Sequence, residues 1–95
     1  GTNDYSTSPQ PPESVFLGGY RNLTALVRTV YPPATPLFLI CGPLIGNPCC
    51  TYISALVQEL QQGGDKYVTY VPLGGVLTQP TDYGCDGHPR QGVGF

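Results

Sequence analysis

The sequence predicts an α/β fold in which parallel strands are covered by helices. Three observations predict it: helix-like and strand-like segments alternate, residues 36–41 (PLFLIC) form an uninterrupted apolar run, and residues 67–71 are rich in β-branched and aromatic side chains. Alternation of this kind favours parallel strands, because a helix usually makes the crossover between them. No repeat or linker divides residues 1–95, so we expect them to belong to one domain.

A loop and then a helix are expected in the first third of the chain. Residues 1–12 are polar and rich in Ser, Thr and Pro, which is typical of a loop. From Glu13 onward, apolar residues recur in steps of three and four until Pro32-Pro33 ends the pattern. Gly18-Gly19 weakens such a helix by about 1 kcal/mol per glycine relative to alanine, so tertiary packing has to hold it. The predicted buried face consists of Phe16, Tyr20, Leu23, Leu26, Val27 and Val30.

The remaining elements follow in the same alternation. The apolar run at 36–41 predicts a strand buried on both faces, and a loop at 42–48 follows it. A second helix is expected at about 50–62, and residues 67–71 form the second predicted strand. A loop of Gly, Pro and Asp residues occupies 80–91, where Pro89 is placed to open a final helix. The second helix should bury Ile53, Leu56, Val57 and Leu60.

Two parallel strands alone would leave both edges of the sheet and at least one face open. The sequence therefore predicts part of a larger α/β sheet, with a further strand preceding Gly1.

Charge and hydropathy exclude two classes of partner. The net charge is −2, and the four Lys and Arg residues do not cluster. Nucleic acids and anionic membranes bind concentrated positive patches, so neither is expected as a partner. The longest apolar stretch, 36–41, is far shorter than the ~20 residues that span a bilayer.

Cysteine usage favours an extracellular location. The chain has four cysteines, and the sequon at Asn22 is a candidate for N-glycosylation. A disulfide between Cys85 and either Cys49 or Cys50 would fix the loop at 80–91, with Cys41 left as a core thiol. A zinc site at Cys85 and His88 lacks a second ligand pair of suitable spacing, so no metal is expected. A catalytic Cys85 beside His88 has no wider support.

Two clusters of residues suited to chemistry lie at opposite ends of the chain. The first is Gly1-Thr2-Asn3-Asp4, and the second is Gly84-Cys85-Asp86-Gly87-His88-Pro89. Each alone has an ordinary structural explanation, since Asn, Asp and Gly are common turn residues. Loops that follow parallel strands gather at one edge of the sheet, where ligands bind. We therefore expect both clusters to face one crevice.

Together the two clusters resemble the SGNH (GDSL-type) hydrolase superfamily. The Gly-x-Asn-Asp motif at residues 1–4, followed far downstream by the histidine loop at 84–89, carries the resemblance. The nearer likeness is to the acetyl esterases of carbohydrate esterase family two, and Cys41-Gly42-Pro43-Leu44-Ile45 fits the strand and loop before the histidine loop there. The resemblance covers residues 1 to about 94. It implies a three-layer α/β/α flavodoxin-like parallel sheet, of which this chain is the C-terminal portion.

The resemblance also implies roles for individual residues. Asn3 would donate its side-chain amide to the oxyanion, Gly1 would keep the backbone close to the site, and Asp4 would brace the loop. His88 would relay the proton between the nucleophile and the leaving alcohol, oriented by Asp86 or by a backbone carbonyl. The implied substrate is an acetylated carbohydrate or another small ester, and the reaction needs no cofactor.

The chain departs from the superfamily at two points. The Asp that usually stands three residues before the histidine is replaced by Cys85; Asp86 lies two before it and Asp82 six before it. The Gly-Asp-Ser segment with the nucleophilic serine is not found, and an acyl-enzyme cannot form without a nucleophile. We therefore expect the chain to be inactive by itself. The four serines in other contexts are Ser6, Ser8, Ser14 and Ser54.

Two non-catalytic hypotheses stand beside the hydrolase. One is a secreted binding module that kept the fold and lost the serine. The other is a small disulfide-stabilised secreted protein, which should have two bridges and no free thiol. Tyr5 and Tyr83 adjoin the two clusters and offer aromatic faces to a sugar. The oligomeric state is not indicated by the sequence.

Overall fold

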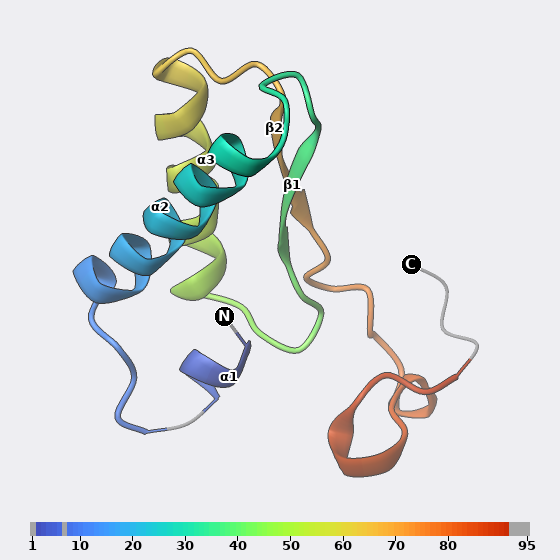
Figure 1. Cartoon of the computed structure of the whole chain (residues 1–95). Coiled ribbons are helices and arrows are strands. Elements are labelled where there is room, and N and C mark those ends of the chain that lie inside the picture. Colours follow the sequence, from blue (N-terminus) through green and yellow to red (C-terminus); the bar gives the residue numbers. More distant parts are fainter. Residues whose placement is uncertain (1, 7, 92–95) are drawn as a thin grey trace.

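A two-stranded parallel sheet with helices on one face forms the centre of the molecule (Figure 1). The computed structural model describes residues 2–6 and 8–91. The elements in chain order are α1 (Thr2–Tyr5), α2 (Glu13–Val30), β1 (Leu37–Cys41), α3 (Cys49–Gln62), β2 (Val68–Pro72) and the 3₁₀ turns η1 (Pro80–Asp82) and η2 (Cys85–Gly87).

The parallel α/β arrangement predicted from the sequence is confirmed. β1 pairs with β2 in parallel, from Leu37 opposite Val68 to Cys41 opposite Pro72, and α3 makes the crossover between them. Because the strands are parallel, both end at the same edge of the sheet, which lies at the bottom of Figure 1. The long helix α2 ends at Val30, just before Pro32-Pro33, as the prolines predicted.

The core lies between the two long helices and one face of the sheet. α3 buries Ile53, Leu56 and Val57 as its periodicity predicted, and Leu60 packs against the core at its margin. Leu39 of β1 and Val68 of β2 meet these side chains from the sheet. Burial of such side chains is worth about 1.5–3 kcal/mol each, which makes this cluster the main source of stability.

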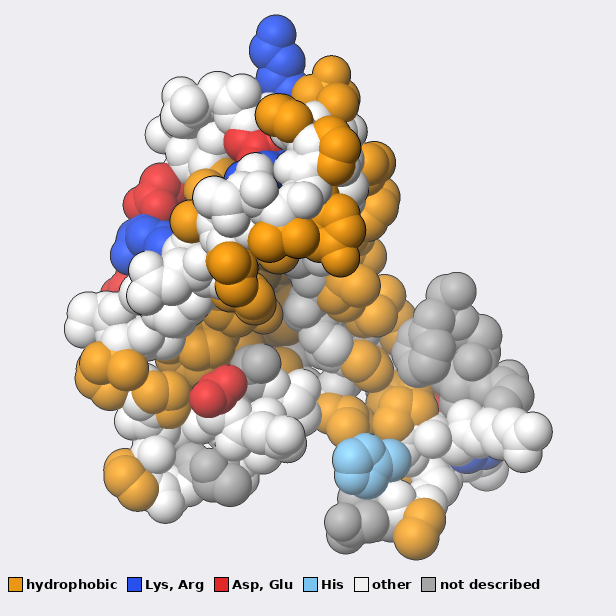
Figure 2. All heavy atoms as spheres, in the orientation of Figure 1, with side chains coloured by type: hydrophobic (Ala, Val, Ile, Leu, Met, Phe, Trp, Pro, Cys, Tyr) orange, Lys and Arg blue, Asp and Glu red, His pale blue; other side chains and the backbone are white. Residues whose placement is uncertain are grey.

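The prediction that residues 36–41 are buried on both faces was wrong. Leu39 and Cys41 face the helices and are buried, whereas Phe38 and Ile40 are 58% and 50% exposed on the opposite face. Successive side chains of a strand point to opposite faces, and no helix among the described residues covers the second one. Figure 2 shows hydrophobic side chains gathered over β1 and the end of α2.

The buried face of α2 also differs from the prediction. Phe16, Leu17 and Thr24 are buried, while Leu23, Leu26 and Val30 are 55%, 58% and 65% exposed. The helix carries two adjoining apolar stripes, and α3 with the sheet covers only one of them. Periodicity identified the helix, but its neighbours decide which stripe is buried.

Two pairs of opposite charges connect α2 with the chain beyond β1. The Arg28 guanidinium donates to both carboxylate oxygens of Asp65, at 2.8 and 3.0 Å, and to the Thr35 carbonyl at 2.6 Å. Arg21 and Glu59 form the second pair, which joins α2 to α3 but is about half exposed. The Arg28 cluster therefore fixes the end of α2 against the turns that lead into both strands.

The C-terminal loop leaves the sheet after β2 and folds largely on itself (Figure 1). Its first residue, Leu73, donates its backbone N–H to the Cys41 carbonyl at 2.9 Å, and Leu77 is buried. Tyr83 and Pro89 form an isolated antiparallel bridge. The final helix expected from Pro89 would extend into residues 92–95, which lie outside the described residues.

Candidate functional site

The first predicted cluster lies on α1, at the edge of the sheet where the parallel strands end (Figure 1). The expected loop contains a helical turn because Tyr5 is anchored in the core. Its ring meets Phe16 edge to face at 5.0 Å between centroids, and its hydroxyl donates to the Pro11 carbonyl at 3.4 Å. Burial raises the pKa of Tyr5, which keeps the hydroxyl protonated as a donor. Asn3 and Asp4 are exposed beside this anchor, and Gly1 lies outside the described residues.

The second predicted cluster is a tight turn that presents His88 to solvent. The Gly84 N–H donates to the His88 carbonyl at 2.6 Å, and the His88 N–H donates to the Cys85 carbonyl at 3.1 Å. Gly87, the residue before His88, has φ +71°, a left-handed conformation that favours glycine. The backbone around His88 is therefore fixed by local bonds.

Asp82 is committed to a structural role in the loop. Its carboxylate accepts the backbone N–H groups of Gln79 and Thr78 at 2.8 and 2.9 Å, and these bonds lower its pKa. The Asp82 carbonyl also accepts the Arg90 N–H at 2.9 Å, across the bridged loop. Asp82 thus shapes the histidine loop. Asp86 lies in η2, but its side chain is outside the described part of the structure.

The two predicted clusters lie apart, although both lie at the same edge of the sheet. α1 packs beside α2 and α3, whereas the histidine loop extends from β2 on the other side of that edge (Figure 1). Figure 2 shows open solvent between the two lobes. The structure therefore does not bring Asn3 and His88 to one crevice, contrary to the expectation. Each cluster is anchored to a different part of the framework, α1 through the buried Tyr5 and the loop through the backbone bond from Leu73 to Cys41.

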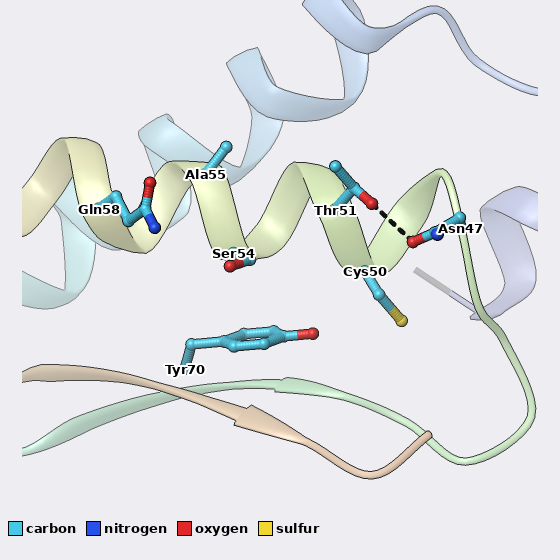
Figure 3. Close-up of a pocket in the computed structure, with 7 residues that line it drawn as sticks. All are labelled: Asn47, Cys50, Thr51, Ser54, Ala55, Gln58 and Tyr70. Carbon is cyan, nitrogen blue, oxygen red and sulfur yellow. Dashed lines mark hydrogen bonds between the residues drawn. The ribbon is translucent and has the colours of Figure 1, made fainter. Parts of the chain in front are cut away.

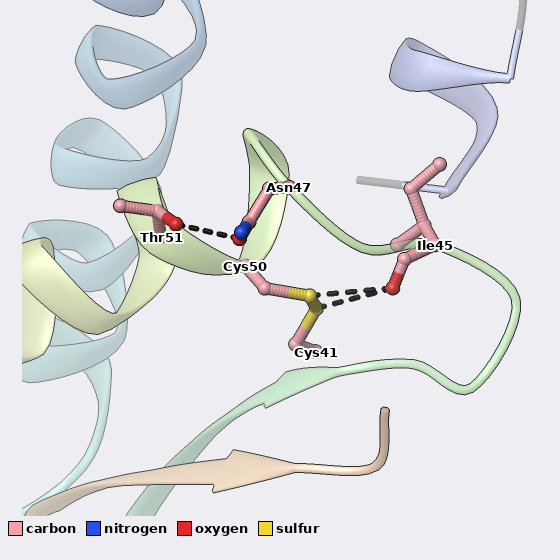
Figure 4. The surroundings of a disulfide bond; sticks show 5 residues. All are labelled: Cys41, Ile45, Asn47, Cys50 and Thr51. Carbon is pink, nitrogen blue, oxygen red and sulfur yellow. Dashed lines mark hydrogen bonds between the residues drawn. A yellow bond between two sulfur atoms is a disulfide. The ribbon is translucent and has the colours of Figure 1, made fainter. Parts of the chain in front are cut away.

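The disulfide differs from the predicted pairing. Cys41 pairs with Cys50 across a separation of 9 residues, with their Cα atoms 5.3 Å apart, while Cys49 and Cys85 are free. Cys41 ends β1 and Cys50 lies in the first turn of α3, so the connecting loop brings them together (Figure 4). Cys49 is one helical step away and faces the core, and Cys85 lies in the distant histidine loop. A bridge of this span lowers the entropy of the unfolded chain and thereby stabilises the fold by about 2.6 kcal/mol.

The bridge surrounds a backbone carbonyl. The Cys41 and Cys50 sulfurs lie 3.7 and 3.3 Å from the Ile45 carbonyl oxygen (Figure 4). In the disulfide neither sulfur carries a proton, so these are sulfur–oxygen contacts; in the dithiol either group would donate its S–H. The bridge thus fixes the loop at 42–48, which borders the edge where α1 lies.

A groove of about 390 Å³ lies between α3 and β2 and was not predicted. Its wall includes the Asn47 side chain, whose carbonyl oxygen accepts the Thr51 hydroxyl at 2.6 Å, and the Tyr70 ring lies across from Ser54 (Figure 3). Four polar residues at helical spacing could have revealed it in the sequence. The residues that line it are Asn47, Cys50, Thr51, Ser54, Ala55, Gln58 and Tyr70, and none of them is charged.

The described residues 2–6 and 8–91 contain no group of three or more His, Cys, Asp and Glu side chains placed to hold a metal ion. No helix in those ranges is long and apolar enough to cross a membrane. No family model, curated protein or solved structure matches this chain.

Proposed function

We propose that this chain is the C-terminal portion of an SGNH-type ester hydrolase that removes acetyl groups from carbohydrates. In this proposal Asn3 supplies an oxyanion donor and His88 the general base, while the serine nucleophile comes from another segment of the domain. The observation that carries the proposal is that both motifs of the family lie at the carboxyl edge of the parallel strands. Ligands of open α/β sheets bind at that edge.

The uncovered surfaces favour a larger, three-layer flavodoxin-like sheet. Within the described part of the chain, β1 has a partner strand on one side only, and its outer face exposes Phe38 and Ile40. Large apolar side chains at half exposure or more, in a contiguous patch, are typical of a surface that another layer covers. Further strands beside β1 and helices over Phe38 would complete that arrangement. They would also offer a place for the serine between α1 and the histidine loop.

The proposed chemistry assigns one step to each group. His88 accepts the proton of the serine hydroxyl as the serine oxygen bonds to the acetyl carbon. The Asn3 amide donates to the oxygen that becomes negatively charged. His88 then protonates the sugar oxygen as its bond to the acetyl carbon breaks, which releases the sugar as an alcohol and leaves an acetyl-serine. Water then attacks the acetyl-serine in the same way, with His88 accepting its proton and returning one to the serine oxygen, and acetate is released. Asp4 braces α1, and the ring of His88 would be oriented by Asp86 or by a backbone carbonyl.

An oxyanion donor typically lowers the activation barrier by about 2.7–4 kcal/mol, so Asn3→Ala should lower kcat by roughly 10²–10³-fold. The assay is release of acetate from acetylated xylo-oligosaccharides by the longest natural form of the protein. Gln62→Ala, which removes an exposed side-chain amide at the end of α3, is the matched control and should keep the parental rate. Equal rates for Asn3→Ala and its control would remove Asn3 from the mechanism.

A second candidate is a secreted carbohydrate-binding module without catalysis. The separation of α1 from the histidine loop favours it, because a silent module does not need the two to converge. This candidate predicts saturable sugar binding by the longest natural form with no acetate release. Detectable hydrolysis that depends on Asn3 excludes it.

A further inference from the structure

We propose that Asn22 carries an N-linked oligosaccharide, transferred to the chain before α2 folds. Asn22, Leu23 and Thr24 form the acceptor sequence Asn-x-Thr, and neither Leu23 nor the following Ala25 is proline. The structure adds three observations: where the asparagine points, what the threonine contacts, and which elements hold the helix. Glycosylation of Asn22 does not depend on hydrolase activity.

Asn22 lies on the solvent side of α2. Tyr20 and Thr24 pack toward the core, and Asn22 stands between them in sequence. An α-helix turns about 100° per residue, so Asn22 points about 200° away from each of these two residues. The side chain is exposed accordingly. An oligosaccharide on its amide nitrogen would extend into water and displace no core side chain.

Thr24 has the opposite environment. It is 4% exposed, and its hydroxyl donates to the Arg21 carbonyl at 3.0 Å within the helix. A transferase that reads both the asparagine and the threonine hydroxyl cannot reach the latter in the folded protein. The sugar must therefore be added while residues 22–24 are still unfolded.

The architecture keeps these residues unfolded during synthesis. Gly18 and Gly19 lower the intrinsic helix propensity of α2, and isolated helices of this length are marginal in water. Apart from Tyr5 of α1, the core partners of α2 are α3 and the sheet, which lie later in the chain. Until α3 has been made, α2 lacks the helix and the strands that cover most of its buried face. The acceptor sequence is thus available as the chain enters the compartment.

The Cys41–Cys50 disulfide points to the same compartment by a separate route. Disulfides of this kind persist in the oxidising secretory pathway, which is also where N-linked sugars are transferred. The donor is an oligosaccharide linked to a lipid through diphosphate. The Asn22 amide nitrogen bonds to the anomeric carbon of the first sugar, and the bond from that carbon to the diphosphate oxygen breaks. The lipid diphosphate leaves and the amide loses one proton.

The test is the mass of the protein after it has been directed into the secretory pathway of a eukaryotic cell by a leader peptide. Lumenal and secreted pools are read together, so that a variant that folds poorly is still measured. We expect the mass of one oligosaccharide above that of the chain, removed by peptide N-glycosidase with conversion of Asn22 to aspartate. Asn22→Gln should lack this mass, and Thr24→Ser should keep it.

Asn47→Gln is the matched control and should remain glycosylated, because Asn47 precedes Pro48 and is no acceptor. An unmodified Asn22 peptide in the parent, or a sugar that persists in Asn22→Gln, would overturn the assignment. The order of events is tested with microsomes that contain the donor. The reduced, unfolded chain should be modified, whereas the folded, oxidised chain should not be. Equal modification of the two would overturn transfer before folding.

Discussion

Gly87 determines the backbone conformation just before His88. Its φ of +71° costs about 1–2 kcal/mol for a residue with a Cβ, so Gly87→Ala should distort the turn. The loop is held by local bonds outside the main core, and we expect the His88 NMR resonances to shift while the unfolding temperature changes little. Gly19→Ala is the control. A Cβ at Gly19 would meet open space within α2, so the substitution should stabilise the protein by about 1 kcal/mol. An unchanged His88 environment in Gly87→Ala would contradict this reading of the turn.

Asp65 links stability to pH. Its hydrogen bonds from Arg28 hold the pKa of the carboxyl below its ordinary value, so ionised Asp65 favours the folded state. A depressed folded pKa contributes stability above the unfolded pKa of about 3.9, and that contribution is lost as the pH falls through the folded value. Asp65→Asn should therefore lose about 1–3 kcal/mol of unfolding free energy at pH 7 in urea titrations. The gap to the parent should shrink below about pH 5.

Glu59→Gln is the corresponding control, because its pair with Arg21 is about half exposed and screened by solvent. Its unfolding free energy should match that of the parent at both ends of the pH range. A gap for Asp65→Asn that stays constant with pH would show that ionisation of Asp65 does not stabilise the fold.

At the scale of elements, the Cys41–Cys50 pairing predicts that Cys49 and Cys85 are free thiols with different reactivity. One thiol, the exposed Cys85, should react at once with a thiol reagent in the native protein. Cys49 is buried, and burial raises its pKa, so it should react only after unfolding. The alternative pairing of Cys85 with Cys49 or Cys50 predicts no native reaction at Cys85. Peptide mapping of the labelled protein decides between the two.

The elements could be predicted from the sequence more securely than their contacts. Proline pairs, apolar periodicity and β-branched runs located α2, α3 and both strands to within a residue or two. The buried face of α2 was missed because Leu23 and Leu26 belong to a second apolar stripe that nothing among the described residues covers. The disulfide was missed because Cys85 was expected to lie beside Cys49 and Cys50, whereas the loop that carries it extends away from the sheet, and Cys41 at the end of β1 lies next to Cys50.

At the scale of the whole molecule, substitutions on the exposed face of the sheet distinguish a part of a larger fold from a self-contained fold. Phe38 is 58% exposed, so Phe38→Thr should change the unfolding free energy of the 95-residue chain by less than about 0.5 kcal/mol. Leu39→Ala, on the buried face of the same strand, should cost about 2–5 kcal/mol. In the longest natural form, a covering layer would make Phe38→Thr costly as well. An equally small effect in both forms would contradict the three-layer sheet.

For the candidate site, the sequence predicted the edge of the sheet at which the two motifs lie but not the distance between them. The motifs at Asn3 and His88 are the basis of the proposed chemistry, and the parallel strands explain why both lie at one edge of the sheet. Their mutual distance is set by contacts that neither motif encodes, through Tyr5 on one side and the backbone bond from Leu73 to Cys41 on the other. The remaining layer of the proposed domain would determine whether the two groups converge.

The central claim is that His88 is the general base of an ester hydrolase, and acetate release by the longest natural form tests it most directly. His88→Ala should lower kcat by roughly 10⁴-fold or more, as loss of a base that acts with a serine does, while unfolding temperature stays at the parental value. The 95-residue chain alone should release no acetate. Full activity in His88→Ala, or no activity in the parent at any acetyl ester, would contradict the hydrolase assignment.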